Sequence, residues 1–236
     1  MSHHELDRRL MRLAAANVAC RDPAREPRNA SPWLPPLLRW QAARLRGSFS
    51  DFLASPREQL AAEFFLTDLY GDFDVSERDR EVERVLPLMR RVLPEKLLLA
   101  IADTLELAVL SHAFDLRMAE ALSTRVDPDG VDADSYAIAY REVGLPRLRR
   151  HQIGLIQSVG LILDRAVSTP FVGSLLRMSR GPARAAGLHD LQDFLERGFA
   201  AFKKLDGAQR FVDEIARREL QVSERLFAGH PRPFER

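Results

Sequence analysis

The feature that most constrains the fold is a long apolar stretch at residues 94–123, PEKLLLAIADTLELAVLSHAFDLRMAEALS. From Leu97 to Leu122, 18 of 26 residues are apolar, and neither Gly nor Pro interrupts them. Ala, Leu, Met and Glu are strong helix formers, and Pro94 suits the start of a helix, where its missing N–H is not needed. A helix that is apolar around most of its circumference belongs in the middle of a bundle.

The polar residues of this stretch fall into two groups when they are placed at 100° per residue. One group forms a single stripe, which we expect to face solvent: Asp103, Glu106, Arg117 and Glu120. The other group lies on other sides of the helix, where buried polar side chains need partners. This second group is the best indication of a site: Thr104, Ser111, His112 and Asp115.

A second strongly apolar helix is predicted at residues 146–167. Gly154 and Gly160 lie within it, and they would let a neighbouring helix approach closely because glycine has no side chain. We expect this helix to pack beside the one at residues 94–123.

The chain as a whole is predicted to be all-α, a single multi-helix bundle of roughly ten helices around these two. No segment shows the alternating pattern of a strand. We expect an N-terminal helical segment with a Pro- and Arg-rich connector at residues 1–50, a helical bundle domain at 51–229 and a tail at 230–236.

Length and composition exclude several classes of protein. The 35 basic and 34 acidic residues give a net charge of +1, so no overall field attracts nucleic acid or anionic lipid. The single cysteine, Cys20, excludes an internal disulfide framework and a Cys-rich zinc site. The N-terminus carries charges where a signal peptide is apolar, and no uncharged apolar run approaches the ~20 residues that span a bilayer. We expect a cytoplasmic protein with no nucleic-acid and no membrane partner.

The first candidate site is a carboxylate–histidine metal centre inside the bundle. His112 and Asp115 are three residues apart and so share a helix face, and Glu63 lies in the otherwise apolar run AAEFFL of another helix. The usual Glu-x-x-His pair is absent. A buried hydrogen-bond cluster that fixes helix register is therefore the favoured interpretation of these residues.

The second candidate is an anion site at a basic turn that contains Arg177, Arg180 and Arg184 around Gly181-Pro182. If a helix begins at Pro182, its first N–H groups and the nearby guanidinium groups would suit a phosphate or carboxylate. We expect further support if the fold brings Arg147, Arg149 and Arg150 near. The competing and commoner interpretation makes the turn a solvated surface, or pairs its arginines with Asp190, Asp193 and Glu196.

Two further patterns, an acidic loop and a set of aromatic residues, are more typical of a turn and a core than of functional sites. The acidic loop DPDGVDAD lacks the spacing of a calcium loop, since Gly130 is fourth when Asp127 is counted as the first residue, whereas a calcium loop has glycine sixth. Several aromatic residues at helical spacing could line an apolar ligand cavity, although such residues are more often core: Phe64, Phe65, Tyr70, Phe114, Phe199 and Phe202.

Two stretches resemble the signature sequences of an uncharacterised family of helical bacterial proteins. They are FFLTDLYG at residues 64–71 and GPARAAGLHDLQDFLERGFAAFKKL at residues 181–205. The similarity extends from about Phe52 to Glu219. This resemblance implies the extent of a helical domain, and no activity, cofactor or residue role comes with it.

The leading functional hypothesis is a ligand-binding or protein-interaction module without catalysis, able to self-associate and to take a small anionic or apolar ligand. This hypothesis requires no cofactor. The alternative is a metal-dependent oxidoreductase of the carboxylate-bridged helical-bundle class, which would hold iron or manganese on Glu63, His112 and Asp115.

Overall fold

The structure is a computed structural model that describes residues 3–69 and 76–235. Its described part contains eleven α-helices and no strand, which confirms the all-α prediction. The helices are α1 (His3–Arg21), α2 (Leu34–Ser48), α3 (Ser50–Ala54), α4 (Gln59–Phe64), α5 (Ser76–Val92), α6 (Glu95–Ser123), α7 (Ala133–Val143), α8 (Pro146–Ser168), α9 (Val172–Ala185), α10 (His189–Leu205) and α11 (Gln209–Phe227).

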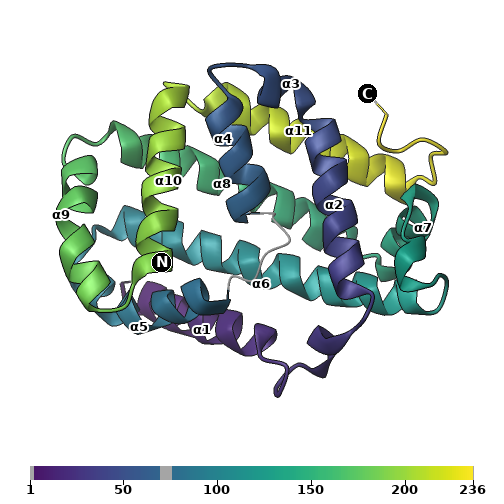
Figure 1. Cartoon of the computed structure of the whole chain (residues 1–236), viewed down its shortest axis with the longest axis horizontal. Coiled ribbons are helices and arrows are strands. Elements are labelled where there is room, and N and C mark those ends of the chain that lie inside the picture. Colours follow the sequence, from purple (N-terminus) through teal and green to yellow (C-terminus); the bar gives the residue numbers. More distant parts are fainter. Residues whose placement is uncertain (1–2, 70–75, 236) are drawn as a thin grey trace.

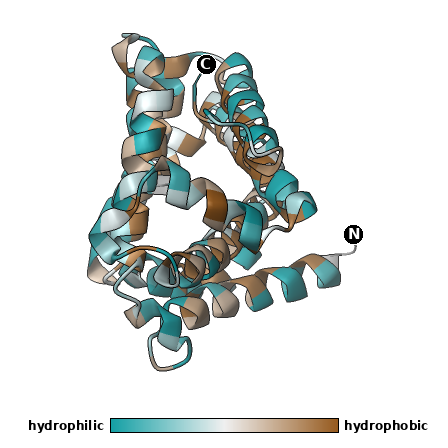
Figure 2. Ribbon diagram, turned by 90° about the vertical axis from the view of Figure 1, so that its right-hand side faces the viewer, coloured by the Kyte–Doolittle hydropathy of each residue, from teal (hydrophilic) through white to brown (hydrophobic). Residues whose placement is uncertain are grey.

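The two predicted apolar helices, α6 and α8, lie side by side at the centre (Figure 1). α11 packs along α8, and α1 and α5 lie together on the opposite side of α6 (Figure 1). α2, α4 and α10 run across the two central helices, whereas α9 and α7 close the two ends. Figure 2 looks along α6 and α8 and shows the other helices arranged around the interior.

The polar stripe of α6 is partly covered, which corrects the expectation that it faces solvent. Arg9 of α1 donates to Asp103 at 2.8 Å and to Glu106 at 2.5 Å. From α8, Ser158 donates to Asp103 at 3.1 Å and the His151 ring bonds Glu106 at 2.7 Å. Asp103 and Glu106 therefore connect α6 to its neighbours, while the other two residues of the stripe, Arg117 and Glu120, are exposed.

Of the two glycines in α8, only Gly160 allows a close approach. A Cβ atom at Gly160 would lie 2.3 Å from Cγ1 of Val212 in α11, whereas a Cβ at Gly154 would meet nothing within 4 Å. The close neighbour at this glycine is α11, while α6 packs beside α8 as predicted.

By length and composition alone, α6 could also span a bilayer, since its most apolar 18 residues have a mean hydropathy of 1.7. The central helix of a helical bundle can have the same length and hydropathy. In this fold α6 contacts α1, α2, α7 and α8.

Candidate functional site

The main candidate site is an elongated cavity of about 1260 Å³ between the helices. Leu97 and Asp115 of α6 both line it, and so do Arg149 and Val167 of α8. Each pair is 18 residues apart, which at 1.5 Å per residue gives a length of about 27 Å along both central helices. This volume exceeds the roughly 300–1,000 Å³ of ordinary ligand pockets.

The walls of the cavity are apolar along most of this length. Side chains from α5, α6, α8, α9 and α10 form them, among others Val85, Ile101, Ile162, Leu176 and Leu195. Of the six aromatic residues that were candidates for a cavity wall, Phe65 and Phe199 line the cavity. Phe64, Phe114 and Phe202 are buried core residues, and Tyr70 lies outside the described residues.

One end of the cavity is polar, and Arg149 near the start of α8 is its central residue. The side chain is 6 % exposed. Its guanidinium lies over two rings, with Cζ 3.6 Å from the Phe114 ring centre and 4.4 Å from that of Tyr140. Nη1 donates to Gln152 at 3.4 Å, while Nε and Nη2 are buried without a hydrogen-bond partner. A buried cation with this little hydrogen bonding is costly unless something else binds it.

The pKa of Asp115 responds to the Arg149 charge, but the two side chains do not form an ion pair. Its carboxylate accepts a 3.2 Å hydrogen bond from Gln41, and burial raises the pKa of Asp115 to about 6. The Arg149 charge acts in the opposite direction but is outweighed. The carboxyl therefore begins to lose its charge just below neutral pH. Arg149 itself forms no ion pair with a carboxylate among the described residues, and its Nε and Nη2 have no hydrogen-bond partner.

The other polar groups at this end are already bonded to one another. Arg44 binds both carboxylate oxygens of Glu219, at 2.5 and 3.0 Å. Gln152 donates to Ser111 at 2.8 Å, and the Tyr140 and Ser223 hydroxyls are 2.8 Å apart. Arg149 is thus the basic side chain there that a ligand could pair with, within the described part of the chain.

His112 has a structural set of partners. Asn29 donates its amide N–H groups to the carbonyls of Cys20 and Glu26, so its oxygen faces the imidazole Nε2 at 2.8 Å. Nε2 therefore carries the proton, and Nδ1 faces Arg21 Nη1 at 3.4 Å. Burial, together with the Arg21 charge, lowers the pKa of His112 to about 4, so the ring is neutral.

The three residues proposed as metal ligands each have separate partners. Glu63 accepts from Gln59 in its own helix at 2.9 Å, while His112 contacts Asn29 and Asp115 contacts Gln41. No group of three His, Cys, Asp or Glu side chains converges as a metal site anywhere in residues 3–69 and 76–235. Three polar residues of α6 instead bond to three different elements: Ser111 to α8, Asp115 to α2 and His112 to the segment after α1.

The basic stretch around Gly181-Pro182 is not a turn, and no helix begins at Pro182. α9 continues through both residues to Ala185, although Pro182 cannot donate the backbone hydrogen bond to the Met178 carbonyl. The chain turns away from the helix at Gly187, two residues after Ala185, where φ is +65°. Leu188 N–H donates a closing hydrogen bond to the Ala183 carbonyl.

The three arginines of this stretch lie along one side of α9. Arg180 binds Glu196 through Nε and Nη2 at 2.6 and 2.7 Å, as the competing interpretation requires. Arg177 donates to Ser174 at 3.1 Å, and Arg184 is exposed. Arg149 does not support this stretch, because it lies at the end of α8 away from α9. An anion site at Arg177, Arg180 and Arg184 stays a prediction.

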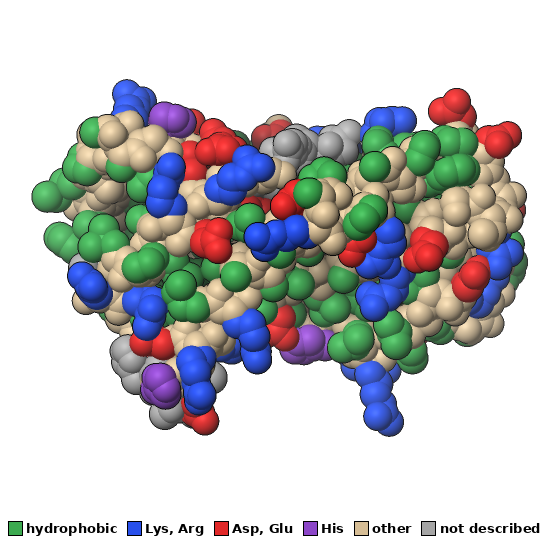
Figure 3. All heavy atoms as spheres, turned by 90° about the horizontal axis from the view of Figure 1, so that it is seen from below, with side chains coloured by type: hydrophobic (Ala, Val, Ile, Leu, Met, Phe, Trp, Pro, Cys, Tyr) green, Lys and Arg blue, Asp and Glu red, His purple; other side chains and the backbone are tan. Residues whose placement is uncertain are grey.

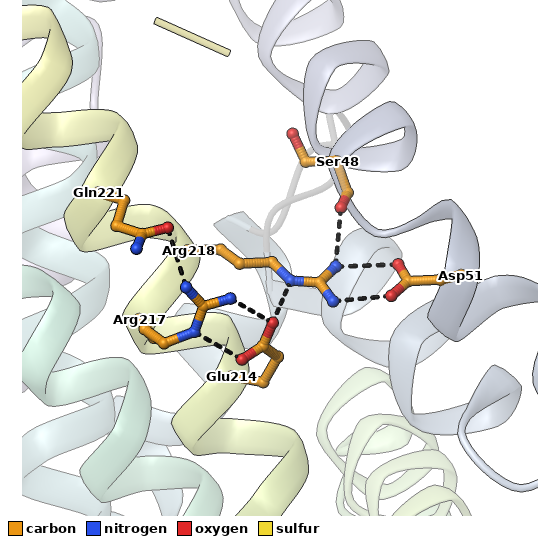
Figure 4. Close-up of polar contacts among 6 residues, drawn as sticks. All are labelled: Ser48, Asp51, Glu214, Arg217, Arg218 and Gln221. Atoms are coloured by element: carbon orange, nitrogen blue, oxygen red, sulfur yellow. Dashed lines mark hydrogen bonds and ion pairs between the residues drawn. The ribbon is translucent and has the colours of Figure 1, made fainter. Parts of the chain in front are cut away.

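A second hollow, of about 770 Å³, lies beside a charged cluster that joins α3 to α11. Arg218 binds Asp51 at 2.9 and 2.7 Å and Glu214 at 2.7 Å (Figure 4). Hydrogen bonds from Arg217 are the main cause that lowers the pKa of Glu214 to about 2. Since these charges neutralise one another, the cluster fits a connection between helices better than a ligand site.

Sequence reasoning named Arg149 only as a reinforcement of another site. A usable signal was present: at 100° per residue Arg149 falls on the same side of the helix as Gln152, Ile156 and Val159. Its neighbours Arg147 and Arg150 are exposed. The run PRLRR alone does not indicate that one of its three arginines is buried.

The sequence profile of one family, described as Domain of unknown function (DUF8198), matches residues 20–233. The match includes both signature stretches and extends beyond the range from Phe52 to Glu219. No curated protein and no solved structure matches the chain. Because the profile covers most of its length, the chain belongs to the DUF8198 family.

Proposed function

We propose that this protein binds an amphipathic small molecule, with an apolar body and an anionic head, in the cavity along α6 and α8. The single observation that carries the proposal is Arg149, a buried cation without a carboxylate partner at the polar end of an otherwise apolar cavity. A carboxylate is the head group that fits best, because its two oxygens match the donors of a guanidinium.

The size of the cavity supports an occupant with a long apolar body. Its volume of about 1260 Å³ is larger than the roughly 300–1,000 Å³ of ordinary ligand pockets, and its walls are apolar along most of a length of about 27 Å. Water satisfies polar walls but not apolar ones, so the apolar length of the cavity calls for an apolar occupant.

The polar and apolar ends of the cavity support one direction for the proposed ligand. Its head lies near Arg149 and Gln152 at the start of α8, and its apolar body extends along Ile156 and Ile162 towards α9 and α10. Ser111 and Asp115 complete the polar end. Protonation of Asp115 removes a negative charge there, so anion binding should strengthen as the pH falls from 7 towards 5.

The test is a titration of the purified protein with straight-chain carboxylates and with the alcohols of the same chain length. The Arg149→Met variant should bind the carboxylates about 10- to 150-fold more weakly, because a charged hydrogen-bonded contact contributes about 1.5–3 kcal/mol. Binding of the alcohols should change little. Arg150→Met is the matched control, since Arg150 adjoins Arg149 but is exposed.

Stability separates a lost contact from a damaged fold. Methionine fills the space between the Phe114 and Tyr140 rings without placing a charge there, so Arg149→Met should not lower the unfolding midpoint. If wild-type protein binds no carboxylate of any chain length, or if Arg149→Met binds them as well as wild type does, the proposal is wrong.

A further inference from the structure

The end of the molecule formed by α5 and α9 carries large hydrophobic side chains on its surface. Phe171 and Met178 are 63 % and 70 % exposed, and Leu175 between them is 42 % exposed. Their spacing of four and three residues puts all three on one edge of α9. Leu88 of α5 is 59 % exposed. Leu88 and Leu175 also line the cavity, so the cavity reaches the surface beside this apolar edge.

A hydrogen bond connects α5 to the residues that follow α9. The Arg84 side chain in α5 donates to the Gly187 carbonyl just after α9, at 2.5 Å. α9 is also held against α10, where Ser179 donates to Gln192 at 3.0 Å and Gly173 gives room to the Phe199 ring. The exposed hydrophobic side chains are therefore presented by a fixed surface.

The opposite edge of α9 is basic. Residues 165–189 contain four arginines and no Asp or Glu. Of these, Arg177 and Arg184 lie on α9, are exposed and form no ion pair with the described acidic residues, while Arg180 is paired with Glu196. On a helical projection the small residues Ser174, Gly181 and Ala185 separate the basic edge from the apolar one. Figure 3, seen from the side of α1 and α5, shows hydrophobic and basic side chains mixed at the end where α9 lies.

We propose that the outward face of α9, together with Leu88 of α5, docks on a lipid bilayer that carries anionic head groups. The apolar edge would enter the interface while Arg177 and Arg184 bind lipid phosphates. The charge balance of residues 165–189 is what selects this partner, because a purely apolar protein surface would leave the arginines without counterions. The proposal replaces the expectation that no membrane takes part.

This docking goes beyond ligand binding and does not depend on Arg149. It places the surface opening of the cavity, beside Leu88 and Leu175, against the bilayer, where an amphipathic ligand is concentrated. The two proposals are thus compatible, and each has its own measurement.

The test is co-sedimentation of the full chain with vesicles of phosphatidylcholine alone and with vesicles of equal parts phosphatidylcholine and phosphatidylglycerol. Wild type should bind the anionic vesicles at least tenfold better than the neutral ones, and added salt should weaken the binding. Phe171→Glu/Met178→Glu and Arg177→Gln/Arg184→Gln should each reduce binding at least tenfold. Ile138→Glu is the control, because Ile138 is 41 % exposed on α7 at the other end of the molecule.

Three results would overturn the docking proposal. One is wild-type protein that stays in solution with anionic vesicles. Another is an Ile138→Glu variant that loses binding as fully as the α9 variants do. The third is a wild-type dimer that Phe171→Glu/Met178→Glu converts to a monomer, which would mean that a second copy covers this face. Carboxylate binding without vesicles, measured on the same variants, shows separately whether the cavity proposal holds.

Discussion

A pair of glycine substitutions in α8 tests the packing that the structure describes. Gly160→Ala puts a Cβ atom 2.3 Å from Cγ1 of the buried Val212, whereas Gly154→Ala puts one into open space. Carbon atoms pack best at about 3.5–4.0 Å, so α11 or the Val212 side chain must move by more than 1 Å in the first variant. Overpacking of this kind costs about 1–3 kcal/mol.

Both substitutions also gain helix propensity, which contributes ~0.5–1 kcal/mol in favour of alanine. Gly154→Ala should therefore raise the free energy of unfolding by that amount. Gly160→Ala should lower it by about 0–2.5 kcal/mol once the same gain is subtracted from the overpacking cost. Because the propensity gain is common to both, their difference of ~1–3 kcal/mol measures the contact between α8 and α11.

Urea unfolding of the two variants gives this difference directly. Val212→Ala removes the clashing atoms, so the double variant with Gly160→Ala should be more stable than the sum of the single changes by at least ~0.5 kcal/mol. Equal stability changes for Gly154→Ala and Gly160→Ala would refute the described approach of α11 to α8.

Two further predictions concern pH, and both use urea unfolding between pH 4 and 8. The pKa of Asp115 is about 6 in the folded state and ~3.9 in the unfolded state, so the free energy of unfolding of wild type falls as the pH rises through this interval. Asp115→Asn should remove that loss and raise the free energy of unfolding by up to ~3 kcal/mol at pH 7. An unchanged pH slope would contradict the burial of this carboxyl. His112 has the opposite effect on the pH dependence, because its pKa is about 4 in the folded state and ~6.5 in the unfolded state. The free energy of unfolding of wild type should therefore fall by up to ~3 kcal/mol as the pH drops from 6.5 to 4, and His112→Gln should remove this loss. Wild-type and variant curves that remain parallel would show that the ring is not held neutral.

The central helices were predictable because their signals are local. The apolar density of residues 97–122, together with Pro94 at the start, gives a helix at 95–123 whatever surrounds it. Gly144 and Pro146 likewise mark where α7 ends and α8 begins. The prediction at Pro182 was wrong because proline is favoured at helix starts, whereas α9 accommodates Pro182 in its last turn.

The cavity was not predictable from periodicity. A helical pattern tells which side of a helix faces inward, but not whether the facing side chains meet. Val159 and Ile162 belong to the same apolar face of α8, but only Val159 is part of the main core cluster. Leu107 and Ala108 are adjacent in α6, and of these only Leu107 belongs to that cluster. The positions of α5, α9 and α10 decide these differences. His112 and Asp115 show the same limit, since three-residue spacing predicted a shared site and each bonds to a different element.

The position of the ion pairs explains how apolar helices can surround a space without closing it. Arg44 with Glu219 connects α2 to α11, Arg218 with Asp51 connects α3 to α11, and Arg9 connects α1 to α6. Fork-shaped contacts between arginine and carboxylate fix the distance and orientation of the helices that they join. Such contacts add little net stability on their own, but they oppose the inward movement that would bury the cavity walls against one another. In the proposed complex these walls are covered by the ligand, and Arg149 is the group within the described cavity that gives the ligand a preferred charge.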